Sequence, residues 1–193
     1  MIPLLALTLF MTPPGISVEG AAGFGGIEWE TTNQPQINSS SAVAFGLKYP
    51  LMKHWALGLS LTFNAYDGDE IWHVGPGMLL LDAMIVHSIP MEDFTLILGA
   101  GLASSLLFSL RHLPEPDGAY QTGKYTYITA GLMAGLNIAI MRTIASGIQV
   151  GFSLKYFTGV FVERCFSGPS KDCREIDNVL QNWMVHFVIS YSF

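Results

Sequence analysis

Charge is scarce in this chain of 193 residues, because only 12% of them are Asp, Glu, Lys or Arg. A typical soluble domain carries about 25% charged residues, so this chain has too little charge to cover an ordinary soluble surface. The formal net charge is -6, and the sequence contains no run of Lys or Arg. Nucleic-acid binding requires a basic surface that neutralises phosphates, and we therefore do not expect it here.

Cysteine is equally scarce. The two cysteines, Cys165 and Cys173, lie in one polar segment, residues 163–178. Neither belongs to a CxxC motif or a Cys/His cluster, so we expect no metal site, and nothing in the sequence indicates another cofactor. The spacing favours a local disulfide, which would place the segment in an oxidising compartment. Two free thiols in a loop are the alternative.

The chain also lacks long apolar runs. Its uncharged stretches at residues 94–110 and 125–141 both fall short of the about 20 residues that a membrane-spanning helix needs. Other apolar stretches are interrupted by Asp82, Lys155 or His186. No set of Lys- or Arg-rich loops is present to orient a helical membrane protein. Membrane helices are therefore the less favoured of the two ways in which such a chain crosses a bilayer.

Alternation of residue types is the dominant pattern. Near the C-terminus, one face of a predicted strand carries Trp183, Val185, Phe187, Ile189, Tyr191 and Phe193. Its other face carries Asn182, Met184, His186, Val188, Ser190 and Ser192. Residues 55–64, 129–140 and 147–156 repeat this alternation of bulky apolar with small or polar side chains. The pattern is typical of a barrel with lipid outside and a narrow lumen inside. A soluble β-sandwich, the alternative, would carry Lys, Glu and Thr on its outer face.

Eight strands are predicted, and they define the fold class. Their expected ranges are residues 18–30, 40–49, 54–66, 77–88, 94–110, 124–140, 145–162 and 179–193. The connections at 50–53, 89–93 and 141–144 are short, whereas those at 31–39, 67–76, 111–123 and 163–178 are longer and polar. We therefore predict an all-β, transmembrane, antiparallel up-and-down barrel with short periplasmic turns and longer extracellular loops. An even strand count places both termini on the periplasmic side.

The N-terminal residues are expected to lie outside this barrel. Residues 1–11 are apolar but too short to span a membrane, and Gly15-Ile16-Ser17 has the small-x-small form of a cleavage site. We predict a signal peptide at residues 1–17 and a single barrel domain at 18–193. Aromatic residues lie where the predicted strands cross the membrane interfaces. They are Tyr49, Trp55 and Phe94 near the short turns, and Tyr66, Trp72, Tyr120, Tyr125 and Trp183 near the long loops.

The last strand carries an assembly-signal pattern, which runs polar, any, Gly, any, any, hydrophobic, any, aromatic. Here His186, Tyr191 and Phe193 match it, whereas Val188 stands at the glycine position. With this strand the chain resembles the small eight-stranded outer-membrane barrels of the OmpA, OmpX and OmpW type. The resemblance implies a Gram-negative-type outer membrane, contact with the lipid bilayer and lipopolysaccharide, and the β-barrel assembly machinery as a partner during insertion. It also implies a monomer.

The lumen of an eight-stranded barrel is just wide enough for side chains to fill it. By alternation, Glu19 and Lys48 face inward near the periplasmic rim, and Asp82, Lys155 and His186 face inward nearer mid-height. Strands four and eight lie on opposite sides of the ring, so Asp82 is expected to reach either His186 or Lys155. Buried charges must pair. We predict a polar network that closes the lumen, with a gated proton or ion path as the alternative.

The remaining inward positions are mostly apolar. They are Leu80, Met84, Ile97, Leu107, Met133, Phe157, Met184 and Val188. A well-packed barrel interior is the favoured interpretation of this set. A pocket or channel for apolar solutes, as in OmpW-like barrels, is the alternative.

Catalysis is a further alternative, because two lipid A-modifying outer-membrane enzymes use eight-stranded barrels. Acyl chemistry requires Ser, His and a carboxylate within hydrogen-bond reach. His186 with Ser190 or Ser192, and His87 with Ser88, are the local pairs, and neither has an evident third member. We therefore expect a non-enzymatic barrel of structural or interaction type with a narrow or plugged lumen.

Overall fold

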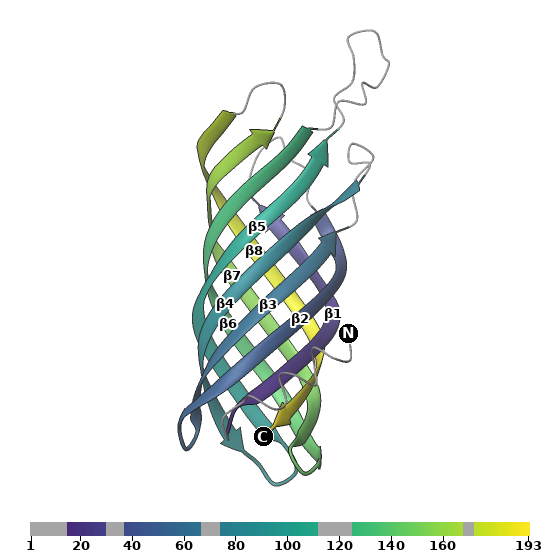
Figure 1. Cartoon of the computed structure of the whole chain (residues 1–193), viewed down its shortest axis with the longest axis vertical. Coiled ribbons are helices and arrows are strands. Elements are labelled where there is room, and N and C mark those ends of the chain that lie inside the picture. Colours follow the sequence, from purple (N-terminus) through teal and green to yellow (C-terminus); the bar gives the residue numbers. More distant parts are fainter. Residues whose placement is uncertain (1–14, 30–36, 67–73, 112–124, 168–171) are drawn as a thin grey trace.

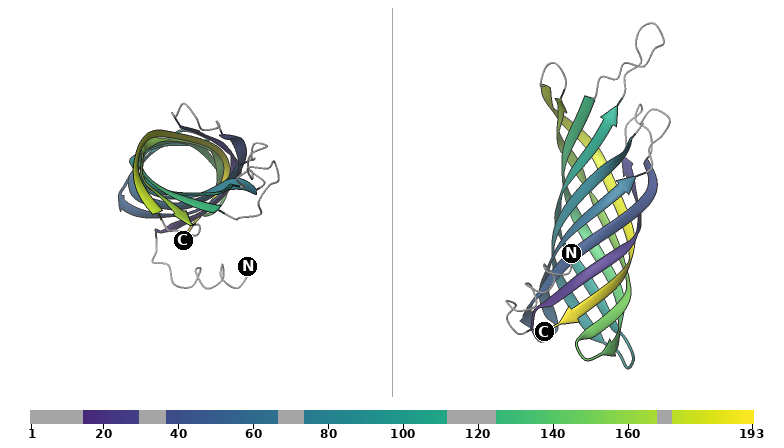
Figure 2. Two further views of the ribbon diagram at one scale, coloured as in Figure 1. Left: turned by 90° about the horizontal axis from the view of Figure 1, so that it is seen from above. Right: turned by 45° about the vertical axis from the view of Figure 1, so that its right-hand side comes forward.

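The computed structural model describes residues 15–29, 37–66, 74–111, 125–167 and 172–193. Within these ranges no helix has the length and apolar character needed to cross a membrane. The described residues form one closed barrel of eight strands in chain order. Figure 1 shows the strands inclined to the long axis, and the left view of Figure 2 shows the closed ring. The predicted all-β barrel and its strand count are confirmed.

The strands are long and are joined to their chain neighbours as antiparallel pairs. They are β1 (Ser17–Trp29), β2 (Ile37–Met52), β3 (Trp55–Tyr66), β4 (Val74–Pro90), β5 (Thr95–Arg111), β6 (Tyr125–Ala145), β7 (Ile148–Ser167) and β8 (Asp172–Ser192). β1 also pairs with β8, from Ser17 opposite Ser192 to Trp29 opposite Leu180. This pairing removes the free strand edges that would leave unpaired backbone groups in lipid.

Several strands extend beyond their predicted limits. The segment 163–178, predicted as a polar loop, is mostly strand, because β7 continues to Ser167 and β8 begins at Asp172. At the other end, β6 continues to Ala145, so its turn to β7 is Ser146–Gly147 and not residues 141–144. The physical reason is common to both differences. Where a strand leaves the apolar layer of the membrane, both of its faces are in polar surroundings. The alternation of residue types then ends, although the backbone hydrogen bonds between the strands continue.

The outer face of the barrel is bulky and apolar. Phe152 is 63% exposed and Leu136 is 59% exposed, whereas their neighbours Ser153 and Asn137 are buried. The same alternation of exposed and buried side chains runs along β3 to β8, with bulky apolar side chains outside and a mixture of small, polar and packed apolar residues inside. Such a surface is stable in lipid and would aggregate in water. The soluble β-protein is therefore excluded.

Both ends of the described chain meet at the end of the barrel that carries the short turns. Gly15 N donates to Phe193 O at 3.0 Å, and Phe193 N donates to Ile16 O at 3.1 Å. Exposed aromatic residues at this end include Tyr49 and Trp55, as expected for a membrane interface. By the rule for such barrels this is the periplasmic end, which lies at the bottom of Figure 1.

Candidate functional site

An ion pair crosses the lumen at mid-height. Lys155 Nζ on β7 lies 2.8 Å from Asp82 Oδ2 on β4 and also donates to Ser60 Oγ on β3 at 2.6 Å. Ser60, which stands directly opposite Asp82 in the register, donates to the same Asp82 oxygen at 2.5 Å. The Asp82 side chain is only 3% exposed. Pairing offsets the large cost of taking these two charges out of water.

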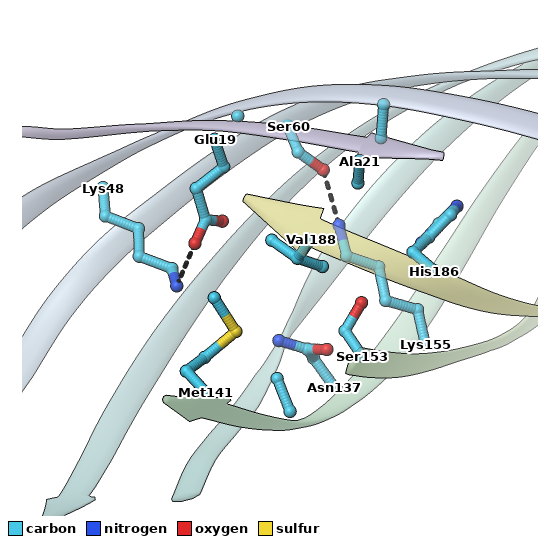
Figure 3. Close-up of a pocket in the computed structure, with 13 residues that line it drawn as sticks. Glu19, Ala21, Lys48, Ser60, Asn137, Met141, Ser153, Lys155, His186 and Val188 are labelled. Carbon is cyan, nitrogen blue, oxygen red and sulfur yellow. Dashed lines mark hydrogen bonds and ion pairs between the residues drawn. The ribbon is translucent and has the colours of Figure 1, made fainter. Parts of the chain in front are cut away.

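A second ion pair lies closer to the periplasmic end. Lys48 Nζ on β2 contacts Glu19 Oε1 on the neighbouring strand β1, and both side chains are 18% exposed. In the register Glu19 faces Gly46, two residues from Lys48, so the pair is diagonal. Figure 3 shows this pair and Lys155 reaching toward Ser60. Four of the five predicted lumen residues therefore form two separate pairs, and the five do not form one network.

A small cavity of about 40 Å³ separates the two pairs. Its walls include Glu19, Lys48, Lys155 and Asn137, together with the apolar Met141. One water molecule needs roughly 10–15 Å³ of such space, so the cavity has room for a few waters. The periplasmic half of the lumen is therefore a narrow vestibule with a mixed polar and apolar lining. It ends at the Asp82–Lys155 pair.

His186 lies beside the ion pair without joining it. Its side chain is 1% exposed, and its Nε2 atom has no hydrogen-bond partner within the described part of the chain. In the register it faces Gly23 on β1 and Ser153 on β7. Figure 3 shows its ring directed away from the Lys155 ammonium. Of the two partners expected for Asp82, the structure therefore brings Lys155 to it and not His186.

Apolar side chains fill the extracellular half of the lumen. The inward residues named from the sequence are all buried in one cluster that also reaches into the periplasmic half, where Met84, Ile97 and Val188 lie; the others are Leu80, Leu107, Met133, Phe157 and Met184. The Phe157 ring covers Gly135, since a β-carbon at that glycine would lie 2.4 Å from the ring. An aromatic ring thus occupies the space that a larger residue on β6 would need.

Sequence reasoning overlooked two members of this layer. Met78 is 0% exposed, and Asn64, directly opposite it in the register, is 1% exposed. The Asn64 amide donates to Met184 Sδ at 3.5 Å, and the Asn182 amide donates to Met78 Sδ at 3.6 Å. These contacts join β3 and β4 to β8 across the lumen. The alternation along 78–86 already indicated that Met78 faces inward, but the contacts of the amides required the structure.

The histidine–serine pairs considered for a catalytic alternative are not joined by hydrogen bonds between their side chains among the described residues. His87 and Ser88 are neighbours on β4 and therefore point to opposite faces. The His87 ring packs against Trp55, with 4.4 Å between ring centroids. Ser192 Oγ is hydrogen-bonded to Ser17 Oγ at 2.7 Å, far from the buried His186 ring along β8. Among the described residues, no side-chain hydrogen bond joins a histidine to a serine.

The C-terminal residues contact the start of β1 at the periplasmic end of the barrel. The outward Tyr191 ring packs edge-on against Phe193, with 4.9 Å between centroids. The expected leader, residues 1–17, stays a prediction, since residues 1–14 lie outside the described part of the chain. Gly15, Ile16 and Ser17 all hydrogen-bond to the C-terminal residues in this structure.

The two cysteines lie in strands and not in a loop. Cys165 on β7 and Cys173 on β8 are directly opposite each other in the antiparallel register. Opposed residues of an antiparallel pair have Cα atoms about 4.5–5.5 Å apart, within the range that a disulfide spans. The predicted disulfide is therefore compatible with the backbone register and remains a prediction.

Comparison with known proteins identifies the fold alone. No protein-family model and no curated protein matches the sequence. Among solved structures, Neisserial surface protein A (NspA) matches with a TM-score of 0.63 and 10% identity, over 93% of this chain and 97% of that chain. A major outer membrane protein of Thermus thermophilus matches with a TM-score of 0.63 and 13% identity, over 93% and 98%. The outer membrane protein OprG of Pseudomonas aeruginosa matches with a TM-score of 0.54 and 12% identity, over 93% and 96%.

These matches agree with what the strands themselves show. The barrel is closed, its outer face is apolar, and its inner face is filled by small, polar and sulfur-containing side chains. Closed barrels are the only β-architecture whose backbone is fully satisfied within a bilayer. The chain is a small eight-stranded transmembrane β-barrel with the fold of bacterial outer-membrane proteins.

Proposed function

We propose that this barrel is a non-enzymatic protein with a plugged lumen, which acts through its outer surfaces in a structural or interaction role. One observation carries the proposal. Five large side chains from four strands fill the extracellular half of the lumen, and none is more than 1% exposed. They are Met78, Leu80, Met133, Phe157 and Met184. Apolar side chains packed at this density leave no path for water or ions.

The charges of the polar half support the same conclusion. Asp82 is neutralised by Lys155, and Glu19 is neutralised by Lys48. No uncompensated charge therefore remains in these two pairs to attract an ion into the lumen. An ion pathway ordinarily requires rings of like charge or a water-filled passage along its length. The paired arrangement favours a plug over a proton or ion path.

Single-channel recording tests the proposal. The wild-type protein in a planar bilayer is expected to give no stable conductance steps. The variant Phe157→Ala/Met184→Ala, which removes two large side chains from the plug, is expected to conduct. Phe152→Ala is the matched control, because Phe152 faces lipid at 63% exposure and its truncation leaves the lumen filled. Stable conductance of the wild type would refute the plug.

A carrier for apolar solutes is the second candidate. It is favoured by the apolar character of the inward residues, which include Leu80, Ile97, Leu107 and Val188. Such a role requires the plug to part, since the side chains pack against one another. Uptake of an apolar fluorescent dye into liposomes that contain the protein, compared with protein-free liposomes, separates this candidate from a permanently closed barrel.

The absence of enzymatic activity is likewise a proposal. It rests on the lack of a hydrogen-bond partner for His186 Nε2 among the described residues, although Ser153 stands opposite it in the register, and on the engagement of Ser192 with Ser17. Mass spectrometry of lipid A from cells with and without the protein is expected to give identical spectra. A change in acylation that depends on His186 would overturn the proposal.

The partners implied by the fold complete this proposal. A barrel with this outer face is surrounded by phospholipid in one leaflet and lipopolysaccharide in the other. Insertion would use the β-barrel assembly machinery, with His186, Tyr191 and Phe193 as part of the signal. Because β1 pairs with β8 along the whole length of β1, from Ser17 to Trp29, the ring is closed, and we propose a monomer.

A further inference from the structure

A groove lies on the lipid-facing surface of β6, β7 and β8, at the periplasmic end of the barrel. Its volume is about 470 Å³, within the roughly 300–1,000 Å³ of typical ligand sites. The residues that line it are apolar except for Arg142, Gly151 and the inward Ser153. They include Ile138, Ile140, Phe152, Leu154 and Phe187. None of the lumen proposals above uses this surface.

The strand register orders the groove by depth. Arg142 stands opposite Val150 in the row nearest the turn. The next row inward is Ile140, Phe152 and Phe187, and the row beyond it is Ile138, Leu154 and Val185. Both rows follow from the pairings of β6 with β7 and of β7 with β8. At about 3.3 Å per residue, the four steps from Arg142 to Ile138 cover about 13 Å along the strand, and a tilt of about 40° makes this about 10 Å of depth, a third of the about 30 Å hydrocarbon core.

Arg142 is the cation at the interfacial end of this groove. It is exposed, and its guanidinium carbon lies 5.7 Å from the centroid of the Phe94 ring, which holds it over the groove. The acidic Glu92 and Asp93 belong to the adjoining β4–β5 turn, yet neither forms an ion pair with Arg142 among the described contacts. A guanidinium is suited to bidentate binding of a phosphate.

We propose that this groove is a binding site for an anionic phospholipid of the periplasmic leaflet, such as phosphatidylglycerol. The phosphate lies at Arg142, and one acyl chain lies along the rows of Ile140 and Ile138 toward the middle of the bilayer. The groove and the lipid are arranged in the same way along the membrane normal. Each has a charged group at the interface, of opposite sign in the two, and apolar surface below it. Charge complementarity thus adds selectivity to the apolar contact that any lipid would make.

Native mass spectrometry of the intact protein tests the site. Protein is reconstituted with equimolar phosphatidylglycerol and phosphatidylethanolamine. It is expected to retain the anionic lipid about fivefold more than the zwitterionic one, because the attraction of one interfacial Arg for an anionic lipid corresponds to about that ratio of affinities. Arg142→Gln is expected to bring the ratio to about one. Lys53→Gln is the matched control, because Lys53 is exposed in the β2–β3 turn at the same end and does not line the groove.

A second variant distinguishes the contribution of the groove's shape to lipid binding from the contribution of the Arg142 charge. Val150→Phe fills the outer face opposite Arg142 while leaving the guanidinium in place, and it is expected to reduce retention of both lipids. If Arg142→Gln fails to fold, a salt titration of the wild type replaces it, since added salt should weaken only the anionic lipid.

Three outcomes would overturn the proposal. They are equal retention of the two lipids by the wild type, an equal loss of selectivity in Lys53→Gln, and a dimer that forms in place of the lipid adduct. The first would leave only non-selective annular lipid at this surface. The second would trace the preference to the overall charge of the periplasmic end. The third would make the groove a contact between copies of the chain.

Discussion

Removing one partner of the Asp82–Lys155 pair is the sharpest test of how the lumen is held together. Lys155→Met leaves the Asp82 carboxylate, 3% exposed, with the Ser60 hydroxyl as its remaining partner in the trio. Breaking a buried ion pair in this way costs about 3–5 kcal/mol. Lys155 is 12% exposed and borders the polar cavity, so rehydration lowers the cost toward about 3 kcal/mol.

The double variant Asp82→Leu/Lys155→Met is expected to behave differently. Both charges are then absent, and apolar side chains of similar volume replace them, so its stability should lie within about 1 kcal/mol of the wild type. Each single variant should be destabilised by about 3 kcal/mol and the double variant largely restored, which gives a coupling energy of about 5 kcal/mol in a double-mutant cycle.

Equilibrium unfolding by urea in phospholipid vesicles, followed by tryptophan fluorescence, measures these differences. The more exposed Glu19–Lys48 pair serves as the comparison, because Lys48→Met should cost no more than about 1 kcal/mol at 18% exposure. The reasoning is refuted if Lys155→Met unfolds within about 1 kcal/mol of the wild type, or if the double variant loses the sum of the two single effects.

Three further predictions concern packing, the turn and the cysteines. Gly135→Ala places a β-carbon 2.4 Å from the Phe157 ring and should lose about 1–3 kcal/mol in the same urea assay; an unchanged midpoint would mean that the ring moves freely. Gly147→Ala forces a side chain onto a φ of 76° in the β6–β7 turn and should cost about 1 kcal/mol, whereas wild-type stability would contradict the strained turn. Cys165 and Cys173 should resist alkylation until the unfolded protein is reduced; labelling of both before reduction would exclude the disulfide.

The sequence determined the fold class because successive residues of a barrel strand face the lipid and the lumen in turn, so that the residue types alternate along the strand. Phe152 and Phe187 had to face outward, while Ser153 and His186 had to face inward, since a shift of one residue would exchange the faces. Strand ends were harder to predict, because the alternation disappears where both faces are polar. The hairpin of Cys165 and Cys173 extends the barrel in that region, and only backbone pairing identifies it as strand.

Tertiary structure decided which inward residues meet. Alternation places Asp82, Lys155 and His186 in one lumen, but the angular position and tilt of β4, β7 and β8 select Lys155 as the partner of Asp82 and leave His186 aside. The groove beside Arg142 has the same origin, because its lining combines three strands with Phe94 of the β4–β5 turn, which the barrel brings beside β6. The sequence by itself determined the inner and outer faces of the barrel. The closed ring decided the contacts, because the distance between side chains across a lumen depends on strand tilt and stagger, which residue type does not encode.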